Sequence, residues 1–396
     1  MLKKVNAEKT ARRFFSQKIT IVCIVCLIVA NTLAYSFFPL TKSGYPLLSF
    51  MTTRGRFDDF YNSTYLEFGS FINTKGNLTL HPLSVLIGNL FSVLTPDVSA
   101  IIFFVLFSGL LFYAIGKLSN SILIPIMVFV SYPYQFTIAR GNNEIILVAI
   151  AAFMYLLVTQ KRFKQSFKTL IILNLVEPYP LYFLQYISFK SQIINQAKKY
   201  IKYASILIVG ALLTKNGRTY ILELISEGRG NVNVVSAGTT LHSSSYGGTM
   251  EFIWSIVSDL SIFEFNYLST LLLAVQFIAF SLLFLFLLRK KDDLDLVTSS
   301  ILIISFWTLF NNPSFDYRLL HFFIPISLMF KENINRKDLP IIIIMILIFI
   351  PKPYILFIHP SNLLGVTLGS IMNPILIFSL IFFTLRRLSN NSVLLN

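Results

Sequence analysis

Two adjacent carboxylates, Asp58 and Asp59, stand shortly after the first long apolar segment of the chain. Carboxylates are costly at a membrane surface unless a partner or a chemical task stabilises them. A carboxylate at the level of the lipid headgroups could accept a proton from a hydroxyl group whose reaction partner is anchored in the same membrane. This acidic pair is therefore the first candidate for a catalytic base.

Acidic and aromatic side chains, Tyr61 and Glu67 among them, recur at helix-like spacing across residues 57–71. We expect a short helix that lies on the membrane, with its phenylalanines among the headgroups and its acids turned toward a cleft. His81 precedes a second apolar stretch, residues 83–94, which is too short to span and predicts another interfacial helix. The alternative is a solvated loop whose acids have no special role.

The composition predicts a membrane protein with many spans. Of the 396 residues, 55% are hydrophobic and only 13% are charged, whereas soluble proteins carry about 25% charged residues. The net charge of +15 falls between apolar segments and not on a soluble surface, which argues against nucleic-acid binding. Cys23 and Cys26 lie inside the first apolar span and are read as small hydrophobic residues.

The fold class that we expect is all-α, a single polytopic domain over residues 1–396 with about ten membrane-spanning helices. A cytoplasmic tail, residues 1–18, precedes an uncleaved first span, and two large extracytoplasmic loops cover residues 40–97 and 215–265. The apolar runs lie at residues 19–39, 98–117, 119–136, 143–160, 201–214, 266–288, 296–311, 317–331, 339–357 and 364–385.

The distribution of cationic side chains predicts the orientation. With the amino terminus in the cytoplasm, 23 of the 33 lysine and arginine residues fall in cytoplasmic segments, although the exterior segments are longer. An excess of lysine and arginine marks the cytoplasmic side of a membrane protein. We therefore expect both termini in the cytoplasm.

Residues 169–189 break the alternation, because lysines on both sides favour the cytoplasm. Glu177 stands before Pro178, Tyr179 and Pro180, and two prolines in three residues disfavour a continuous helix. We expect a hairpin of two half-spanning helices that enters from the cytoplasm and turns at these prolines. A kinked span is the alternative, and it would invert every later loop.

A second polar cluster joins two spans on the expected exterior side. Arg140 ends one span, Gly141 allows a tight turn, and Asn142, Asn143 or Glu144 can cap the helix that follows. Arg140 beside a helix amino terminus could bind an anionic phosphate. The alternative is a capped turn with an ion pair between Arg140 and Glu144.

A third cluster contains Asp316, Tyr317 and Arg318, followed by His321. A guanidinium group suits a phosphate or pyrophosphate, and aromatic rings suit stacking on a sugar. The alternative is an interfacial anchor made of the tyrosine and the arginine. The four histidines of the chain have no metal-ligand spacing.

These clusters, in this order, resemble the polytopic GT-C glycosyltransferases, in particular the glycosyltransferase 87 (DUF2029) type, over roughly residues 15–330. Glu177 stands where that family has a lysine. The segments that carry the resemblance are Asp59-Phe60-Tyr61, Arg140-Gly141-Asn142-Asn143-Glu144, Glu177-Pro178-Tyr179-Pro180 and Asp316-Tyr317-Arg318 to Pro325.

The resemblance implies transfer of a sugar from a polyprenyl-phosphate donor to a lipid-linked or glycan acceptor, with inversion, on the extracytoplasmic face of a bacterial inner or plasma membrane. Asp59 would be the general base, with Asp58 as a second candidate or a supporting group. No cofactor is expected, and a divalent metal is not indicated. The donor phosphate would be bound by Arg140, Arg318, His81 and His321. The substrates would be bound by Tyr61, Asn142, Asn143, Glu144, Glu177, Tyr179, Asp316 and Tyr317.

Two other functions fit parts of the pattern. A polysaccharide polymerase or ligase of the Wzy type would have similar topology and would use arginines of the loop 215–265. A flippase or transporter of lipid-linked sugars would need ionisable residues in the middle of the membrane that face a cavity, and the sequence offers little beyond Glu177.

Overall fold

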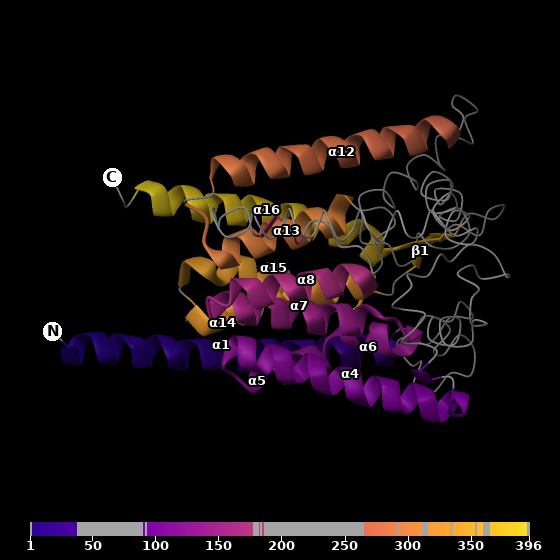
Figure 1. Ribbon diagram of the computed structural model, residues 1–396, viewed down its shortest axis with the longest axis horizontal. Coiled ribbons are helices and arrows are strands. Elements are labelled where there is room, and N and C mark those ends of the chain that lie inside the picture. Colours follow the sequence, from indigo (N-terminus) through magenta and orange to yellow (C-terminus); the bar gives the residue numbers. More distant parts are fainter. Residues whose placement is uncertain are drawn as a thin grey trace.

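The computed structural model describes residues 2–37, 90–91, 93–176, 182, 184–185, 265–290, 293–310, 316–332, 334, 336–352, 355–358 and 365–393. These residues form a bundle of helices that run roughly along one direction (Figure 1). The α-helices, in chain order, are α1 (Leu2–Phe37), α4 (Pro96–Ser119), α5 (Leu123–Phe129), α6 (Tyr132–Arg140), α7 (Glu144–Thr159), α8 (Phe163–Val176), α12 (Phe265–Arg289), α13 (Leu296–Phe310), α14 (Phe323–Glu332), α15 (Leu339–Phe349) and α16 (Leu368–Val393).

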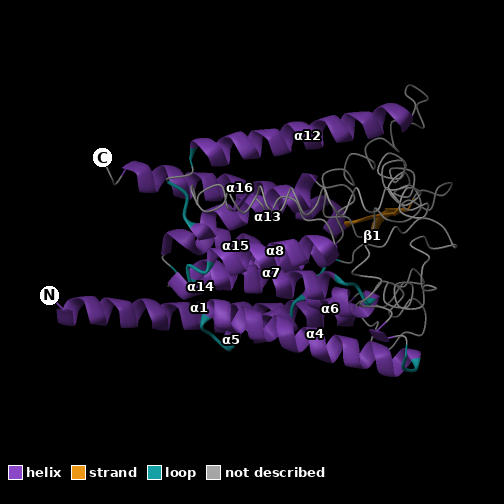
Figure 2. Ribbon diagram, in the orientation of Figure 1, coloured by secondary structure: helices purple, strands orange, loops and turns teal. Residues whose placement is uncertain are grey.

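Shorter elements join these helices. The 3-10 helix η5 (Asp316–Phe322) leads directly into α14, and η6 (Arg336–Asp338) leads into α15. Between α15 and α16, strands β1 (Ile355–Ile358) and β2 (Gly365–Thr367) pair antiparallel. Helices dominate the described chain, and the two strands lie at one end of the bundle (Figure 2).

The two ends of the bundle differ. We call the end at which both termini lie the tail end, and the opposite end, where β1 lies, the site end (Figure 1). Helix η5 packs against α6 near that end. Helices α4 and α12 run from the site end toward the tail end, whereas α8 runs in the opposite direction (Figure 1). The turn between α6 and α7 lies at the site end.

Local sequence explains where several helices begin. Thr95 and Ser131 have extended backbones, and each is followed within two residues by a proline of the first helical turn. Proline is well placed there, because the first turn needs no backbone N–H donors. Gly141 ends α6 with a φ of 70°. A residue without a Cβ atom adopts that backbone readily, which confirms the predicted tight turn.

The expected span 119–136 is wrong as a continuous helix. The chain forms α5 and α6 instead, with a break at Val130 and Ser131. Pro133 has no N–H to continue a helix through this point. The side-chain amide of Asn31, in α1, donates a hydrogen bond of 2.6 Å to the carbonyl oxygen of Val130. This contact satisfies a carbonyl that the break exposes.

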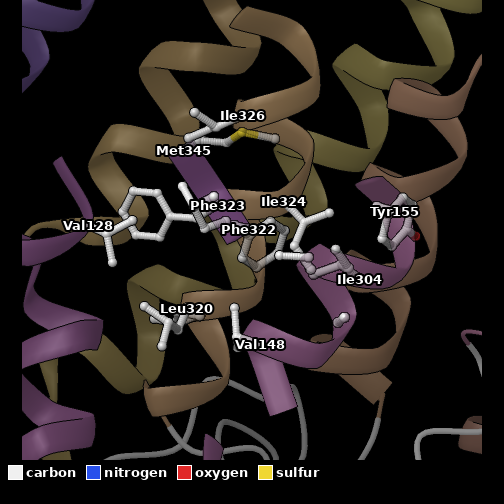
Figure 3. Packing of buried hydrophobic residues seen from close by; sticks show 14 of the residues in the cluster. Val128, Val148, Tyr155, Ile304, Leu320, Phe322, Phe323, Ile324, Ile326 and Met345 are labelled. Carbon is white, nitrogen blue, oxygen red and sulfur yellow. The ribbon is translucent and has the colours of Figure 1, made fainter. Parts of the chain in front are cut away.

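The core lies between helices that are apolar on nearly every side. Helix α7 packs along α4 and α8, and most of its side chains are buried. Figure 3 shows Val148 and Tyr155 of α7 close to side chains of η5, α13 and α14. The rings of Phe323 and Phe349 stack with their centroids 4.1 Å apart and an angle of 6° between their planes.

Three described helices contain a segment that is long and apolar enough to cross a membrane, at Phe14–Leu33, Asp97–Ser119 and Leu368–Ser389. The sides of these segments expose large apolar side chains, including Val105 and Phe382. Outside a membrane such surfaces would be unfavourable, because apolar area in water costs about 25 cal/mol per Å². The structure therefore supports a helical protein associated with a membrane.

Two other spans differ from expectation. Apolar residues 339–357 do not form one helix, because α15 ends at Phe349 and β1 follows. The span expected from residue 364 starts with β2. Apolar runs rich in isoleucine suit a strand as well as a helix, so hydropathy alone does not separate the two. The span 201–214 lies outside the described residues, as do the interfacial helices except for residues 90–91, 93 and 94.

Candidate functional site

Three buried side chains from separate segments meet near the site end. Nε2 of His321, in η5, lies 2.5 Å from Oε1 of Glu144, the first residue of α7. Nδ1 of the same ring lies 2.5 Å from the hydroxyl oxygen of Tyr182. Glu144 and His321 are each 1% exposed. We call these three residues the Glu144 cluster.

The Glu144 cluster can hold a proton between its members. One arrangement satisfies both contacts of His321: the Tyr182 hydroxyl donates to Nδ1, and Nε2–H donates to the carboxylate of Glu144. A protonated imidazole would donate to both neighbours instead. A buried carboxylate is stabilised by such a donor, which explains why Glu144 can lie inside the bundle.

A second buried carboxylate occupies the start of η5. Asp316 accepts a hydrogen bond of 3.0 Å from the hydroxyl of Tyr132, in α6, and one of 3.2 Å from the amide of Asn373, in α16. We call these three residues the Asp316 cluster. Because both clusters contain residues of η5, this short helix joins α6, α7 and α16 through polar contacts.

Lys352 brings a cationic side chain close to the Asp316 cluster. It follows the end of α15, and its ammonium donates to the carbonyl oxygens of Ile350 and Ile348 at 3.0 and 3.3 Å. Burial lowers the pKa of Lys352 from 10.5 to about 7, although the negative charge of Asp316 opposes this shift. Lys352 can therefore exchange a proton near neutral pH.

Polar contacts continue from the Glu144 cluster toward the tail end. The ring of Tyr182 packs edge-on against that of Tyr155, with centroids 6.2 Å apart. The Tyr155 hydroxyl donates to Oε1 of Gln185 at 3.0 Å, and Nε2 of Gln185 donates to Oγ of Ser299 at 2.8 Å. Tyr155 lies three turns after Glu144 on α7, so these contacts lead from the site end toward the tail end.

The predicted residues of the second cluster lie at the turn between α6 and α7. Oδ1 of Asn142 accepts a 2.9 Å hydrogen bond from the backbone N–H of Glu144. Asn143 occupies the cap position of α7 without a side-chain cap bond. Arg140 is the last residue of α6, and its side chain lies outside the description. Glu144 contacts His321, a contact that the sequence did not predict.

The predicted residues of the third cluster all belong to η5, but their described side chains have different neighbours. Asp316 and His321 enter the two buried clusters, whereas Arg318 lies half-buried over the ring of Trp307, with its guanidinium carbon 5.8 Å from the ring centre. Tyr317 belongs to η5, and its side chain is outside the description. The structure therefore brings His321 and Glu144 together and places Arg318 against α13.

The remaining predicted residues lie outside the described part of the chain. The segment with the acidic pair nevertheless has both of its ends at the site end, because α1 finishes at Phe37 and α4 starts at Pro96 there (Figure 1). Likewise, α8 finishes at Val176, next to the proline segment. The undescribed predicted residues are Asp58, Asp59, Tyr61, His81, Glu177 and Tyr179.

The sequence analysis missed four polar residues that the structure places in or beside the clusters, namely Tyr132, Tyr182, Asn373 and Lys352. A signal existed for Asn373, which lies within an expected span directly before Pro374. Polar side chains inside apolar spans usually have a partner or a function. The same signal existed for Lys352, which lies within the expected span 339–357.

Among the residues described, no group of three histidine, cysteine, aspartate or glutamate side chains is placed to hold a metal ion. Comparison of the chain with protein-family models, with curated proteins and with solved structures found no match.

Proposed function

We propose that the protein is an inverting glycosyltransferase that uses a polyprenyl-phosphate sugar as donor and a lipid-linked or glycan acceptor. One observation carries this proposal. Polar and ionisable side chains from α6, α7, η5 and α16 gather at the site end of an apolar bundle. The two helices that flank Asp58 and Asp59 in the sequence, α1 and α4, end and begin there. An activated sugar carried on a lipid would be presented at such a boundary.

In the proposed reaction Asp59 takes the proton of the acceptor hydroxyl, and Asp58 supports or replaces it. The acceptor oxygen then forms a bond to the anomeric carbon from the face opposite the phosphate. The bond between that carbon and the phosphate oxygen breaks, and the polyprenyl phosphate leaves with the electron pair. Arg140 and Arg318 would stabilise the developing charge of the phosphate.

The proposal places the site end outside the cytoplasm and both termini inside it. The described lysines and arginines support this orientation, because they concentrate at the tail end. Those near the ends of helices there include Lys117, Lys161, Arg162, Lys164, Arg289, Lys290, Lys331, Arg386 and Arg387. We also retain about ten spans for the whole chain.

Residues 169–189 would form the re-entrant hairpin of this topology. Helix α8 starts at the tail end and stops at Val176, before the two prolines. Tyr182 then contacts His321, and Gln185 contacts Ser299 near the start of α13, which lies toward the tail end. This direction is the one that a chain returning to the cytoplasmic side would have.

Transfer assays in proteoliposomes test the proposal. The purified protein, given labelled polyprenyl-phosphate sugars and acceptor lipids, should release polyprenyl phosphate only when an acceptor is present. Asp59→Asn should lower the rate by at least about 100-fold, the usual contribution of a general base. Lys290→Gln is the matched control, because Lys290 is exposed at the tail end and should leave the rate unchanged.

Two results would change the assignment. Full activity of Asp59→Asn together with loss of activity in Asp58→Asn would move the base to Asp58. Activity that survives in the double variant would remove this mechanism altogether.

The Glu144 cluster favours a second candidate, a transporter or flippase of lipid-linked sugars. Ionisable residues buried inside a membrane bundle often belong to proton or substrate pathways, and Glu144 and His321 are buried deeply. The polar contacts from Tyr182 to Ser299 extend toward the tail end. In the same proteoliposomes a flippase would move the donor across the bilayer without consuming it.

A further inference from the structure

A groove opens at the tail end, far from both polar clusters. It lies between α1, the connection of α4 with α5, and the end of α14, and its volume is about 880 Å³. Sites for small-molecule ligands usually have volumes of about 300–1,000 Å³. Nothing in the proposed transfer reaction uses this groove.

Two lysines from different helices line the groove. Lys117 lies near the end of α4, with its ammonium 5.7 Å from the centre of the Tyr113 ring. Lys331, near the end of α14, donates a hydrogen bond of 2.8 Å to the hydroxyl of Thr159. That bond orients the ammonium and uses one of its three N–H groups. The described lining of the groove contains no carboxylate side chain.

The rest of the lining combines polar and apolar groups. Gln17 and Thr20 of α1 face the same space as Phe112 of α4 and Pro125 of α5. A soluble phosphate compound would be matched by a mainly polar site, whereas this lining suits a ligand with a charged head and an apolar body. Charge complementarity therefore points to an anionic amphiphile.

The helices beside the groove expose apolar side chains along their length. In α1, Ile21 and Val25 are 51% and 52% exposed, and in α4, Leu110 is 47% exposed. Both helices contain segments long and apolar enough to span a membrane. The groove therefore lies where the headgroup of a lipid would be if its acyl chains covered these exposed side chains.

We propose that this groove binds an anionic phospholipid, with its phosphate between Lys117 and Lys331 and its acyl chains along α1 and α4. Basic pockets between membrane helices commonly hold lipid headgroups, and each lysine near the surface adds to the attraction. The site is separate from the transferase site and does not depend on it. It would select among the lipids of the membrane leaflet at the tail end.

Native mass spectrometry of the full chain in detergent micelles tests the proposal. The protein is titrated with phosphatidylglycerol and with phosphatidylcholine of the same acyl composition. We expect phosphatidylglycerol to bind at least about tenfold more tightly, and the variant Lys117→Gln/Lys331→Gln to lose that preference. Lys290→Gln, an exposed lysine at the same end, should retain it.

A second variant keeps the charges and fills the space. Gln17 is exposed and lines the groove, so Gln17→Trp should fold normally and still weaken phosphatidylglycerol binding about tenfold. Equal binding of the two lipids by the wild-type protein would overturn the proposal, as would unchanged binding by both variants. Displacement of the lipid by millimolar inorganic phosphate would overturn it too, because the site would then recognise a free anion.

Discussion

The contact between Glu144 and His321 can be measured by a double-mutant cycle. The cycle compares the free energy of unfolding of the wild-type protein with those of Glu144→Ala, His321→Ala and the double variant. Both side chains are almost fully buried, so water cannot replace a lost partner. A cycle isolates the pairwise energy from the other contacts that each residue makes.

The expected magnitudes follow from the number of contacts. Glu144→Ala removes the charge-assisted contact with His321 and should cost about 3 kcal/mol, as for other broken buried pairs. His321→Ala removes the contact with Glu144 and also that with Tyr182, so we expect about 4 kcal/mol. The double variant should lose only about 5 kcal/mol, because the shared contact is lost once, which gives a coupling of about 2 kcal/mol.

Unfolding by denaturing detergent in mixed micelles, followed by far-ultraviolet circular dichroism, supplies these free energies. Ser379→Ala is the control, since its half-buried hydroxyl donates a hydrogen bond to the carbonyl of Ile375 in the same helix, and we expect a change below about 0.5 kcal/mol. A coupling under about 0.5 kcal/mol would refute the arrangement of the Glu144 cluster. An equal cost for the two single variants would refute the role of Tyr182 in it.

Three further predictions concern other parts of the bundle. Lys352→Met should abolish a rise in the free energy of unfolding between about pH 7 and pH 10. The pKa of Lys352 is about 7 in the folded protein, below the value of 10.5 in the unfolded chain. The unfolded chain therefore binds one more proton in this range, so the free energy of unfolding rises with pH, by at most about 1.4 kcal/mol per pH unit. Phe349→Ala should lower the free energy of unfolding by about 4 kcal/mol, because the buried ring stacks on Phe323. Arg387→Ala should lower it by about 2 kcal/mol, since Asp338 loses a cation 3.2 Å away.

Each of these has a result that counts against it. An unchanged pH slope in Lys352→Met would place the titrating group elsewhere. Phe349→Leu keeps most of the apolar volume and should cost about 1 kcal/mol, so an equal loss in both variants would deny the importance of stacking and shape. For Arg387, the same loss in Arg386→Ala would show that only the general positive charge of the helix end matters.

Sequence patterns predicted the parts of the fold that depend on neighbours in the chain. Gly141 predicted the tight turn between α6 and α7, and its φ is positive there. This feature follows from the backbone of one residue, so it does not need the rest of the protein. The break between α5 and α6 also had a local cause in Pro133, but the apolar composition concealed it.

The strands after α15 could not be predicted in the same way. Residues 355–358 are as apolar as a helix in lipid would be, and their conformation depends on pairing with residues 365–367. A strand needs a second strand to satisfy its backbone, whereas a helix satisfies its own. Hydropathy records only the shared preference for an apolar environment.

By itself, the sequence predicted a helical chain associated with a membrane, because its apolar composition is a sum over residues. Only the tertiary structure decided that Glu144 meets His321, 177 positions away, and that Asp316 meets Tyr132, 184 positions away. Such pairs depend on which helices are neighbours and how far each is rotated. That choice is made by the packing of the whole bundle, which no short stretch of sequence contains.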